Sequence, residues 1–266
     1  MVINNNILLK TALTASYKAA CSILKIYNSD FNFELKKDNS PITLADKESN
    51  IIITDILKTT NIPIISEESK KIPYDIRKNY EYTWIVDPLD GTKEFIKRNG
   101  EFAINIALAH KGNVIIGVIC VPYLNIIYFA SNNIGSYKLN NFKLYDIPNI
   151  SLDEIIKSSK KLPLKSNKEK IILCSNSHLN NETKNFIEKL SDKNYKIIKK
   201  GSSIKFGIIA EGKADIYPRL SPTMEWDTAA GQIIVEQTGK KILNFNTRET
   251  LKYNKKDLKN PSFIIE

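Results

Sequence analysis

One short stretch, Trp84–Thr92, constrains this chain more than any other. An apolar run stops there at two carboxylates three residues apart, Asp87 and Asp90. Pro88 presets the backbone φ of the turn between them, so both carboxylates can face one side, and Gly91 lets the backbone approach a ligand closely. Mg²⁺ prefers carboxylate oxygens and keeps water or phosphate as its other ligands, so this pattern suits Mg²⁺ better than zinc. The sequence therefore predicts a strand that ends in a site for one or two magnesium ions.

The composition is that of an ordinary globular protein with a basic surface. Its 266 residues are 42% hydrophobic, enough to bury a sizeable core as one large domain or two lobes. The formal net charge is +10, but only four of the 39 basic residues are arginines. Arginine is the favoured residue for gripping phosphates and base edges, so this surplus of lysine argues against a dedicated nucleic-acid-binding protein. A solvated lysine surface is the simpler interpretation, although it would also help to gather an anionic substrate.

Three cysteines stand far apart, at Cys21, Cys120 and Cys174, and their spacing indicates neither a disulfide framework nor a zinc site. We expect them to be buried, reduced thiols. No run approaches the ~18 apolar residues that span a bilayer, and the N-terminus lacks the pattern of a secretion signal. The sequence therefore predicts no transmembrane segment and a cytoplasmic location.

The hydrophobic pattern of the first sixty residues predicts two helices. Residues 5–28 place their large apolar side chains near one side at helical spacing. Residues 43–58 have the same character, and Thr43 is placed to cap this second helix, with Asp46 in its first turn. We therefore expect a pair of helices to precede the magnesium site in the chain.

Strands follow these helices. Residues 61–66 are typical of a short buried strand, which ends at a second pair of acids, Glu67 and Glu68. After the magnesium motif come four β-branched or aromatic runs separated by short turns, which predict an antiparallel meander. These runs cover 102–109, 113–121, 126–130 and 134–139.

The second half of the chain predicts a layered α/β lobe. Between about 141 and 168 the sequence is rich in lysine and serine without a firm period, so we divide the chain into lobes at 1–150 and 151–266. Beyond this boundary strands alternate with helices. The strands are expected near 170–174, 195–199 and 214–217, and the helices near 181–191, 203–211 and 227–238.

Each acid has an ordinary explanation when it is taken alone. Asp87 and Asp90 suit a turn, Asp46 suits the first turn of a helix, and Asp227 suits a helix N-cap before an alanine pair. Glu67 and its neighbour suit a solvated loop. The combination is harder to explain, because five matches to Asp-Pro-x-Asp-Gly-Thr arise by chance about once in a million windows at a frequency near one in twenty per position.

Four segments together resemble the Mg²⁺-dependent, lithium-sensitive phosphatases that include inositol monophosphatase, fructose-1,6-bisphosphatase and 3′(2′),5′-bisphosphate nucleotidase. They occur in the family's order and cover the chain from about 36 to 240. The segments are Ser40–Asp46, Ser66–Ser69, Trp84–Phe95 and Glu225–Gly231. The resemblance implies an α+β fold, a layered αβαβα sandwich in which an N-terminal helix pair lies on an antiparallel sheet beside a C-terminal α/β lobe.

The resemblance also implies roles for the acids. A first metal ion would be held by Glu68, Asp87 and the backbone carbonyl of Leu89. A second would be held by Asp87, Asp90 and Asp227, with Asp87 bridging the two, and the family uses two or three Mg²⁺ ions. Two ions at about 3.5–4 Å activate an attacking water on one side and stabilise the leaving oxygen on the other.

A catalytic group of three residues is implied in the same way. The attacking water would be oriented by Glu68 and by the hydroxyl of Thr92, which Asp46 engages. Gly91 and Thr92 are expected to open a helix whose N–H groups bind phosphate oxygens. No covalent phosphoenzyme is required.

Residues of the second half resemble those of bacterial bisphosphate nucleotidases within this family, and they imply a subsite for the second phosphate. Lys205 and Arg219 would supply positive charge beside Ser202. Simpler alternatives stay open, because Lys205 is one lysine among many and Gly201 to Ser203 suits a helix cap. The implied substrate contacts are Glu68, Leu89, Asp90, Gly91, Thr92, Ser177, His178, Ser202, Lys205, Arg219 and Asp227.

The leading hypothesis is hydrolysis of the 3′-phosphate of 3′-phosphoadenosine 5′-phosphate to AMP and phosphate, with the phosphosulfate as a second substrate. Its implied role is recycling a by-product of sulfate activation. The alternatives are an inositol monophosphatase and, in a different class, a basic nucleic-acid-binding protein. We expect a monomer or homodimer with no stable nucleic-acid partner, and the resemblance allows peripheral attachment to the inner face of the cell membrane.

Overall fold

The computed structural model describes residues 4–36, 41–164, 169–176, 180–191 and 195–266. Its centre is a seven-stranded sheet in the order β3-β4-β5-β6-β7-β8-β9, in which every neighbouring pair is antiparallel except β3 and β4. The predicted meander is confirmed. The strands are β3 (Ile64–Ser66), β4 (Tyr82–Asp90), β5 (Ala103–His110), β6 (Asn113–Val121), β7 (Ile126–Ser131), β8 (Gly135–Asn140) and β9 (Lys160–Lys161).

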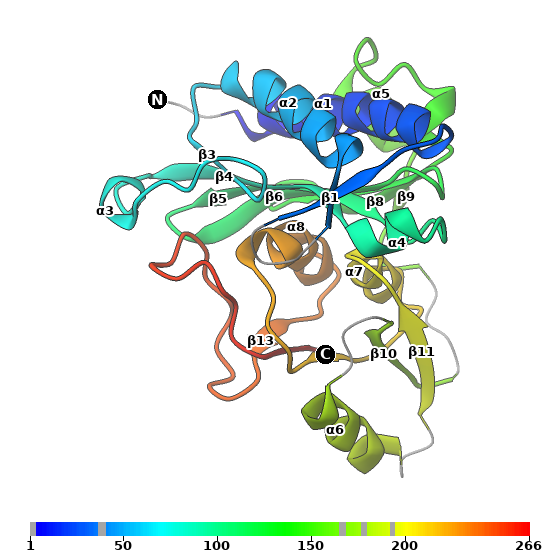
Figure 1. Cartoon of the computed structure of the whole chain (residues 1–266). Coiled ribbons are helices and arrows are strands. Elements are labelled where there is room, and N and C mark those ends of the chain that lie inside the picture. Colours follow the sequence, from blue (N-terminus) through cyan, green and yellow to red (C-terminus); the bar gives the residue numbers. More distant parts are fainter. Residues whose placement is uncertain (1–3, 37–40, 165–168, 177–179, 192–194) are drawn as a thin grey trace.

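Helices cover both faces of this sheet, as Figure 1 shows. On one face lie α1 (Asn5–Tyr27) and α2 (Leu44–Lys58), and on the other lie α7 (Ile204–Ala210) and α8 (Glu225–Glu236). Beyond α7 and α8 come two small sheets and then an outer helix, which completes the predicted αβαβα sandwich. These elements are β10 (Ile171–Ser175), β11 (Lys196–Lys200), β12 (Tyr217–Arg219), β13 (Ile242–Asn244), β14 (Phe263–Ile265) and α6 (Asn181–Ser191).

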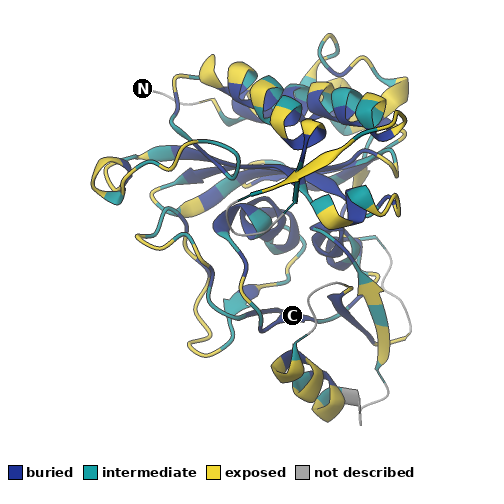
Figure 2. Ribbon diagram, in the orientation of Figure 1, coloured by how far each residue is buried: buried dark blue, intermediate teal, exposed yellow. Residues whose placement is uncertain are grey.

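The alternating side chains of the large sheet feed two hydrophobic cores. In β4, Trp84 and Val86 face the core under α1 and α2, whereas Ile85 faces the core under α7 and α8. Because both faces are covered, these strands are apolar along almost their whole length, as the dark blue centre of Figure 2 shows. Burial of this kind contributes about 25 cal/mol per Å² of apolar surface, and it fixes the end of β4 rigidly in the middle of the molecule.

The long elements agree with the sequence-based predictions, whereas several short ones were missed. Strand β12 lies three residues later than expected, since Pro218 sits within it and weakens its strand pattern. The missed elements have only two to six residues each, too few to show a period. They are β1 (Phe33–Leu35), β2 (Pro41–Thr43), α3 (Tyr74–Arg77), a 3₁₀ turn (Phe142–Leu144), α5 (Leu152–Lys157), β9, β13 and β14. The helix expected to open at Gly91 and Thr92 is α4 (Thr92–Ile96).

Helix α1 has the length and mean hydropathy of a membrane-spanning helix, a signal that the sequence analysis did not register. Half of its apolar window is buried inside the fold, where residues such as Leu9 and Leu13 pack against the sheet. The packing therefore accounts for the apolar side of α1 without a membrane. The division into lobes at 1–150 and 151–266 stays a prediction, and α8 from the second lobe packs directly on β5 and β6 of the first.

Candidate functional site

The carboxylates of Asp87 and Asp90 meet because β4 breaks its pairing with β5 at this point. Asp87 pairs with Asn105 and Asp90 with Ala103, so the two residues between the acids have no partner in the ladder. The side chain of Asp87 accepts a hydrogen bond from the backbone N–H of Leu89 at 3.0 Å. This bulge brings both acids to the same end of the strand.

Gly91 completes the turn with a left-handed backbone, at φ +91°. A side chain at this position would put its Cβ only 2.9 Å from the carbonyl oxygen of Glu101 and 3.3 Å from the Cβ of Ser202. The turn therefore needs glycine both for its dihedral angle and for the close approach of these two segments.

The third acid of the cluster, Asp227, comes from the first turn of α8. Its carboxylate accepts a hydrogen bond from the backbone N–H of Met224 at 2.7 Å, which holds it at the helix N-terminus. Carboxylate oxygens of Asp87, Asp90 and Asp227 all lie within 4.8 Å of one another. The structure thus brings together three acids that the sequence places up to 140 residues apart.

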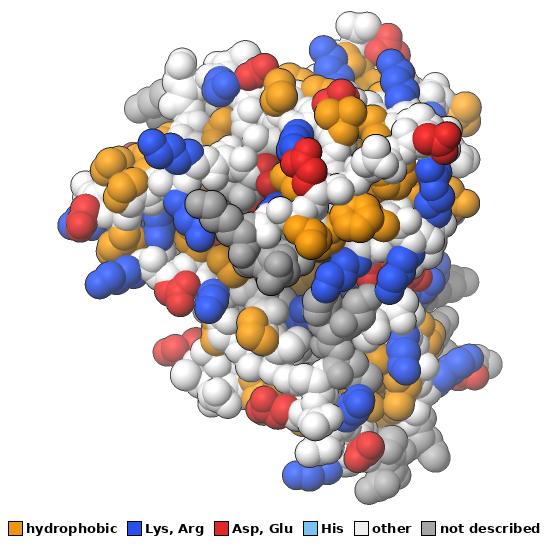
Figure 3. All heavy atoms as spheres, viewed as in Figure 1, with side chains coloured by type: hydrophobic (Ala, Val, Ile, Leu, Met, Phe, Trp, Pro, Cys, Tyr) orange, Lys and Arg blue, Asp and Glu red, His pale blue; other side chains and the backbone are white. Residues whose placement is uncertain are grey.

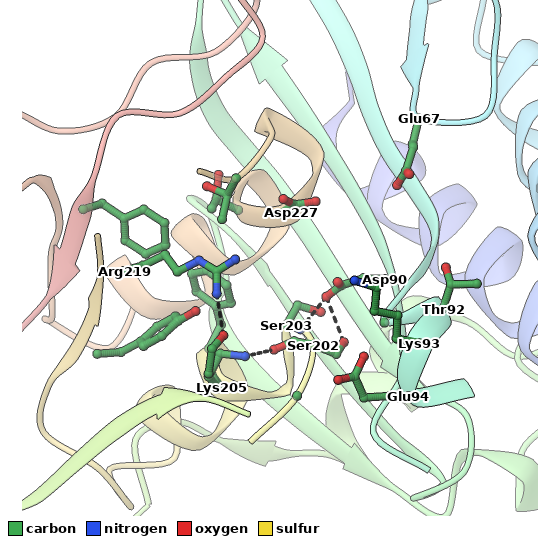
Figure 4. Close-up of a pocket in the computed structure, with 18 of the residues that line it drawn as sticks. Glu67, Asp90, Thr92, Lys93, Glu94, Ser202, Ser203, Lys205, Arg219 and Asp227 are labelled. Atoms are coloured by element: carbon green, nitrogen blue, oxygen red, sulfur yellow. Dashed lines mark hydrogen bonds between the residues drawn. The ribbon is translucent and has the colours of Figure 1, made fainter. Parts of the chain in front are cut away.

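A fourth acid faces this cluster, and it is Glu67, where the sequence-based interpretation had chosen Glu68. The backbone N–H of Glu67 continues the pairing of β3 with β4 by donating to the Val86 carbonyl at 3.2 Å. Because Ser66 pairs with Val86, Glu67 lies beside Asp87 and points to the same side of the sheet. Figure 4 shows the Glu67 carboxylate directed into the pocket.

The two glutamates share one cation at the end of β3. Lys36 Nζ lies 2.8 Å from an oxygen of Glu67 and 2.5 Å from an oxygen of Glu68. Burial lowers the pKa of Lys36, but the two carboxylates outweigh it and raise that pKa above its usual value. Glu67 is therefore the acid of this pair that lines the pocket, where the sequence analysis had expected Glu68.

The clustered carboxylates have too little positive charge around them to keep their pKa values at the usual level. Burial, followed by repulsion from Glu67, Asp90 and Asp227, raises the pKa of Asp87 well above its usual range. Burial, and then Asp90, raises the pKa of Asp227 to about 8. Burial raises the pKa of Glu67 as well, although Lys36 opposes this. A divalent cation placed among the four carboxylates would reverse these shifts, since it favours their charged forms.

Thr92 and Asp46 form the hydrogen-bonded pair that the sequence analysis expected. Thr92 Oγ1 donates to Asp46 Oδ1 at 3.0 Å. The other oxygen of Asp46 accepts from the N–H and the hydroxyl of Thr43, at 2.7 Å and 2.6 Å, so the carboxylate is fixed at the start of α2. Because the Thr92 hydroxyl donates its only hydrogen to Asp46, its oxygen lone pairs can accept a hydrogen bond from a water in the pocket.

The opposite wall of the pocket comes from the loop before α7 and from β12. Ser202 Oγ donates to Asp90 Oδ2 at 2.8 Å, and the Ser203 N–H donates to the same oxygen at 2.5 Å. Lys205 is almost fully buried, and its Nζ donates to the carbonyls of Ser202 at 2.6 Å and Lys200 at 3.1 Å. Lys205 therefore braces this loop and also lines the pocket, and its contact with a substrate stays a prediction.

Arg219 lies beside this loop on β12. It donates to Ser175 Oγ at 2.5 Å and weakly to the Pro222 carbonyl at 3.5 Å, and its buried Nε has no partner among the described residues. Two further expected contacts, Ser177 and His178, lie outside the described residues.

The cavity has a volume of about 240 Å³. Its walls combine the acids, the hydroxyl groups and an aromatic side, and Figure 4 shows how the labelled side chains converge. Leu89 is buried at the base of the acid turn, and its carbonyl lies 3.4 Å from Thr92 Oγ1. Twelve lining residues are not among the predicted site residues: Pro41, Glu67, Lys93, Glu94, Ser175, Gly201, Ser203, Phe206, Tyr217, Thr223, Thr228 and Phe263. Those within the four family segments had a signal, as Lys93 and Glu94 did within Trp84–Phe95.

Residues 4–266 match the model of the inositol monophosphatase family. The chain belongs to this family. A crystal structure of CysQ from Bacteroides thetaiotaomicron superimposes with a TM-score of 0.91 at 43% identity, covering 98% of this chain and 97% of that one. The inositol monophosphatase fold is also seen in an enzyme of Thermotoga maritima, with a TM-score of 0.72 at 22% identity over 96% of this chain and 89% of that one.

Two curated relatives are named 3′(2′),5′-bisphosphate nucleotidase CysQ. The protein from Buchnera aphidicola is 42% identical over 224 residues, covering 83% of this chain and 78% of that one. The protein from Escherichia coli K12 is 34% identical over 251 residues, covering 93% of this chain and 94% of that one.

The donor set of this family member fits magnesium. Members of the inositol monophosphatase family are generally Mg²⁺-dependent, and this chain holds three acids in a cluster with a fourth beside it. All four acids offer oxygen ligands, and within the described part of the chain no cysteine or histidine joins the cluster. The site therefore suits a hard cation.

Proposed function

We propose that this protein is a Mg²⁺-dependent phosphatase that hydrolyses the 3′-phosphate of 3′-phosphoadenosine 5′-phosphate to AMP and phosphate. The observation that carries the proposal is the convergence of four carboxylates beside the Thr92–Asp46 pair, in a pocket whose lining also includes hydroxyl groups and Arg219. The names of the curated relatives support the nucleotide substrate. The phosphosulfate analogue is a second substrate of the same kind.

Four acids and one carbonyl would hold the ions. Glu67, Asp87 and the Leu89 carbonyl would bind one Mg²⁺, and Asp87, Asp90 and Asp227 a second, and a third ion would join them during turnover. When bound, the ions lower the pKa of the attacking water and neutralise charge on the phosphoryl oxygens. The bulge in β4 makes this possible, because it turns Asp87 and Asp90 toward one point.

The remaining groups would position the reactants. Asp46 holds the Thr92 hydroxyl so that its lone pairs accept a hydrogen bond from the attacking water, and Glu67 would take a proton from it. Gly91 and Thr92 would contact the scissile phosphate from the turn. Ser202 and Arg219 would contact the second phosphate, together with Ser177 and His178. Lys205 would support that subsite by fixing the loop from Lys200 to Ser202.

The surface gives no reason to prefer nucleic-acid binding. On the face shown in Figure 3, basic side chains are scattered among acidic ones and do not form a continuous stripe. Several described lysines also pair with acids, as Lys36 and Lys138 do.

The protein would act in the cytoplasm, where its three cysteines stay reduced. All three are free thiols in the structure. Attachment to the membrane is not needed, since the apolar side of α1 is packed in the core. Light scattering of the purified protein would distinguish a monomer from a homodimer.

A substrate panel tests this function. Phosphate release is measured with Mg²⁺ for 3′-phosphoadenosine 5′-phosphate, its phosphosulfate and inositol 1-phosphate, with the Asp90→Asn variant as the blank. We expect kcat/KM to be highest for the two nucleotides. Faster turnover of inositol phosphate by orders of magnitude would refute the nucleotide assignment and favour an inositol monophosphatase. Tight, steeply salt-dependent DNA binding without phosphatase activity would refute both.

A further inference from the structure

A substrate with two phosphates needs positive charge near each of them. The described lining includes three cationic side chains, and two of them already form hydrogen bonds within the protein. Lys205 donates to two backbone carbonyls and lies 5.3 Å from the centre of the Tyr217 ring. Arg219 is tied to Ser175. The third is Lys93.

Lys93 differs from the other two in being exposed. It follows Thr92 in the first turn of α4, and its side chain extends from that helix into the pocket (Figure 4). Among the described residues, no carboxylate forms a salt bridge with its ammonium, whereas Lys36 and Lys200 both have one. Its charge is therefore available to an anion that enters the pocket.

The position of Lys93 in the chain indicates which of the two substrate phosphates it contacts. It is the neighbour of Thr92, which hydrogen-bonds to Asp46, and Asp90 lies three residues before it at the end of β4. Lys93 directly follows Asp90, Gly91 and Thr92, so its backbone lies on the side of the metal acids and of the attacking water. Ser202 contacts Asp90 at 2.8 Å, whereas Arg219 lies on the other wall of the pocket.

We propose that the Lys93 ammonium contacts the phosphate whose ester bond is hydrolysed and stabilises the charge on its non-bridging oxygens in the transition state. This inference rests on the proposed phosphatase activity, but it does not depend on which alcohol carries that phosphate. Electrostatic contacts that strengthen in the transition state raise kcat more than they lower KM. Lys93 would thus be a catalytic residue in addition to those that the sequence predicted.

The test compares Lys93→Met, which removes the charge at similar length, with Lys93→Arg, which keeps it. Lys97→Met is the matched control, because Lys97 is an exposed lysine at the other end of the same short helix. With saturating Mg²⁺, we expect Lys93→Met to lower kcat by about 10²-fold on both the nucleotide bisphosphate and inositol 1-phosphate. KM should change less, Lys93→Arg should recover part of the rate, and Lys97→Met should resemble the wild type.

A binding measurement accompanies the kinetics. Inorganic phosphate is titrated calorimetrically into the Mg²⁺-loaded protein, and Lys93→Met should bind it at least tenfold more weakly than Lys97→Met does. An unchanged kcat and unchanged phosphate affinity would overturn the proposal. A loss confined to the bisphosphate would also overturn it, because it would place Lys93 on the second phosphate. If the wild type prefers inositol phosphate, the nucleotide assignment fails while the Lys93 comparison still stands on that substrate.

Discussion

Asp227→Asn should stabilise the metal-free protein at alkaline pH while it removes the response to Mg²⁺. The substitution deletes one negative charge from a cluster whose oxygens lie within 4.8 Å of one another. Asparagine has nearly the same shape and can still accept the hydrogen bond from the Met224 N–H. The change therefore separates the charge of this residue from its role at the N-terminus of α8.

The magnitude follows from Coulomb's law. At 4.8 Å and an effective dielectric constant of about 20, one pair of like charges costs ~3.5 kcal/mol. For a chain of this size each kcal/mol shifts Tm by about 2–4 °C, so relief of one repulsion corresponds to ~7–14 °C. The gain from relieving repulsion by Glu67 is smaller, because Glu67 is already paired with Lys36.

The effect of the Asp227 charge on the free energy of unfolding depends on pH. The pKa of Asp227 is raised from 3.8 to about 8 in the folded protein, so the folded state binds this proton more tightly than the unfolded state does. The stability of the metal-free wild type should therefore fall as pH rises from about 4 to 8. In Asp227→Asn this part of the slope disappears. The two proteins should be most similar at or below about pH 4, already differ somewhat at pH 5, and differ most near pH 9.

Thermal melts of both proteins at pH 5, 7 and 9, in EDTA and in 10 mM Mg²⁺, test this reasoning. In EDTA the variant should melt higher than the wild type at pH 9. Mg²⁺ should raise the Tm of the wild type by more than that of the variant. The reasoning is refuted if Asp227→Asn melts lower than the wild type at pH 9 in EDTA, or if Mg²⁺ stabilises both proteins equally.

Three further predictions concern the same pocket. Glu67→Gln should raise the Mg²⁺ concentration for half-maximal activity by at least ~10–100-fold, the range typical when a residue that supports a metal ligand is changed. Glu68→Gln should raise this concentration far less. Equal effects of the two substitutions would contradict the placement of Glu67. Thr92→Val should lower kcat by about 10²–10⁴-fold with little change in Mg²⁺ affinity, as stopped-time phosphate assays will show. The apparent Mg²⁺ affinity should strengthen as pH rises toward about 8, because Asp227 must lose its proton to bind; isothermal titration at pH 6 and 8 would contradict this if the affinities agree.

Local patterns in the sequence were enough for much of this fold. The helical spacing of residues 5–28 and 43–58 and the strand runs after the magnesium motif predicted elements close to those observed. These segments succeed because they are long and bury one consistent set of side chains. The pairing of Thr92 with Asp46 came from the resemblance, and a 3.0 Å hydrogen bond confirms that contact.

The choice between Glu67 and Glu68 needed long-range structure. Both acids follow the same short strand, and only the parallel register of β3 with β4 decides which one lies beside Asp87. A shift of one residue exchanges the faces of a strand, so the motif alone left this choice open. Lys205 shows the same limit, because its burial and its hydrogen bond to the Ser202 carbonyl depend on tertiary structure that the local sequence does not show.

Anomalous diffraction from crystals soaked in Mn²⁺ tests the central claim most directly, since Mn²⁺ takes the same oxygen ligands as Mg²⁺. The account predicts at least one strong anomalous peak bounded by Asp87, Asp90 and Asp227, with Glu67 beside it. A map with no peak between these carboxylates, from crystals that show Mn²⁺ elsewhere, would contradict it.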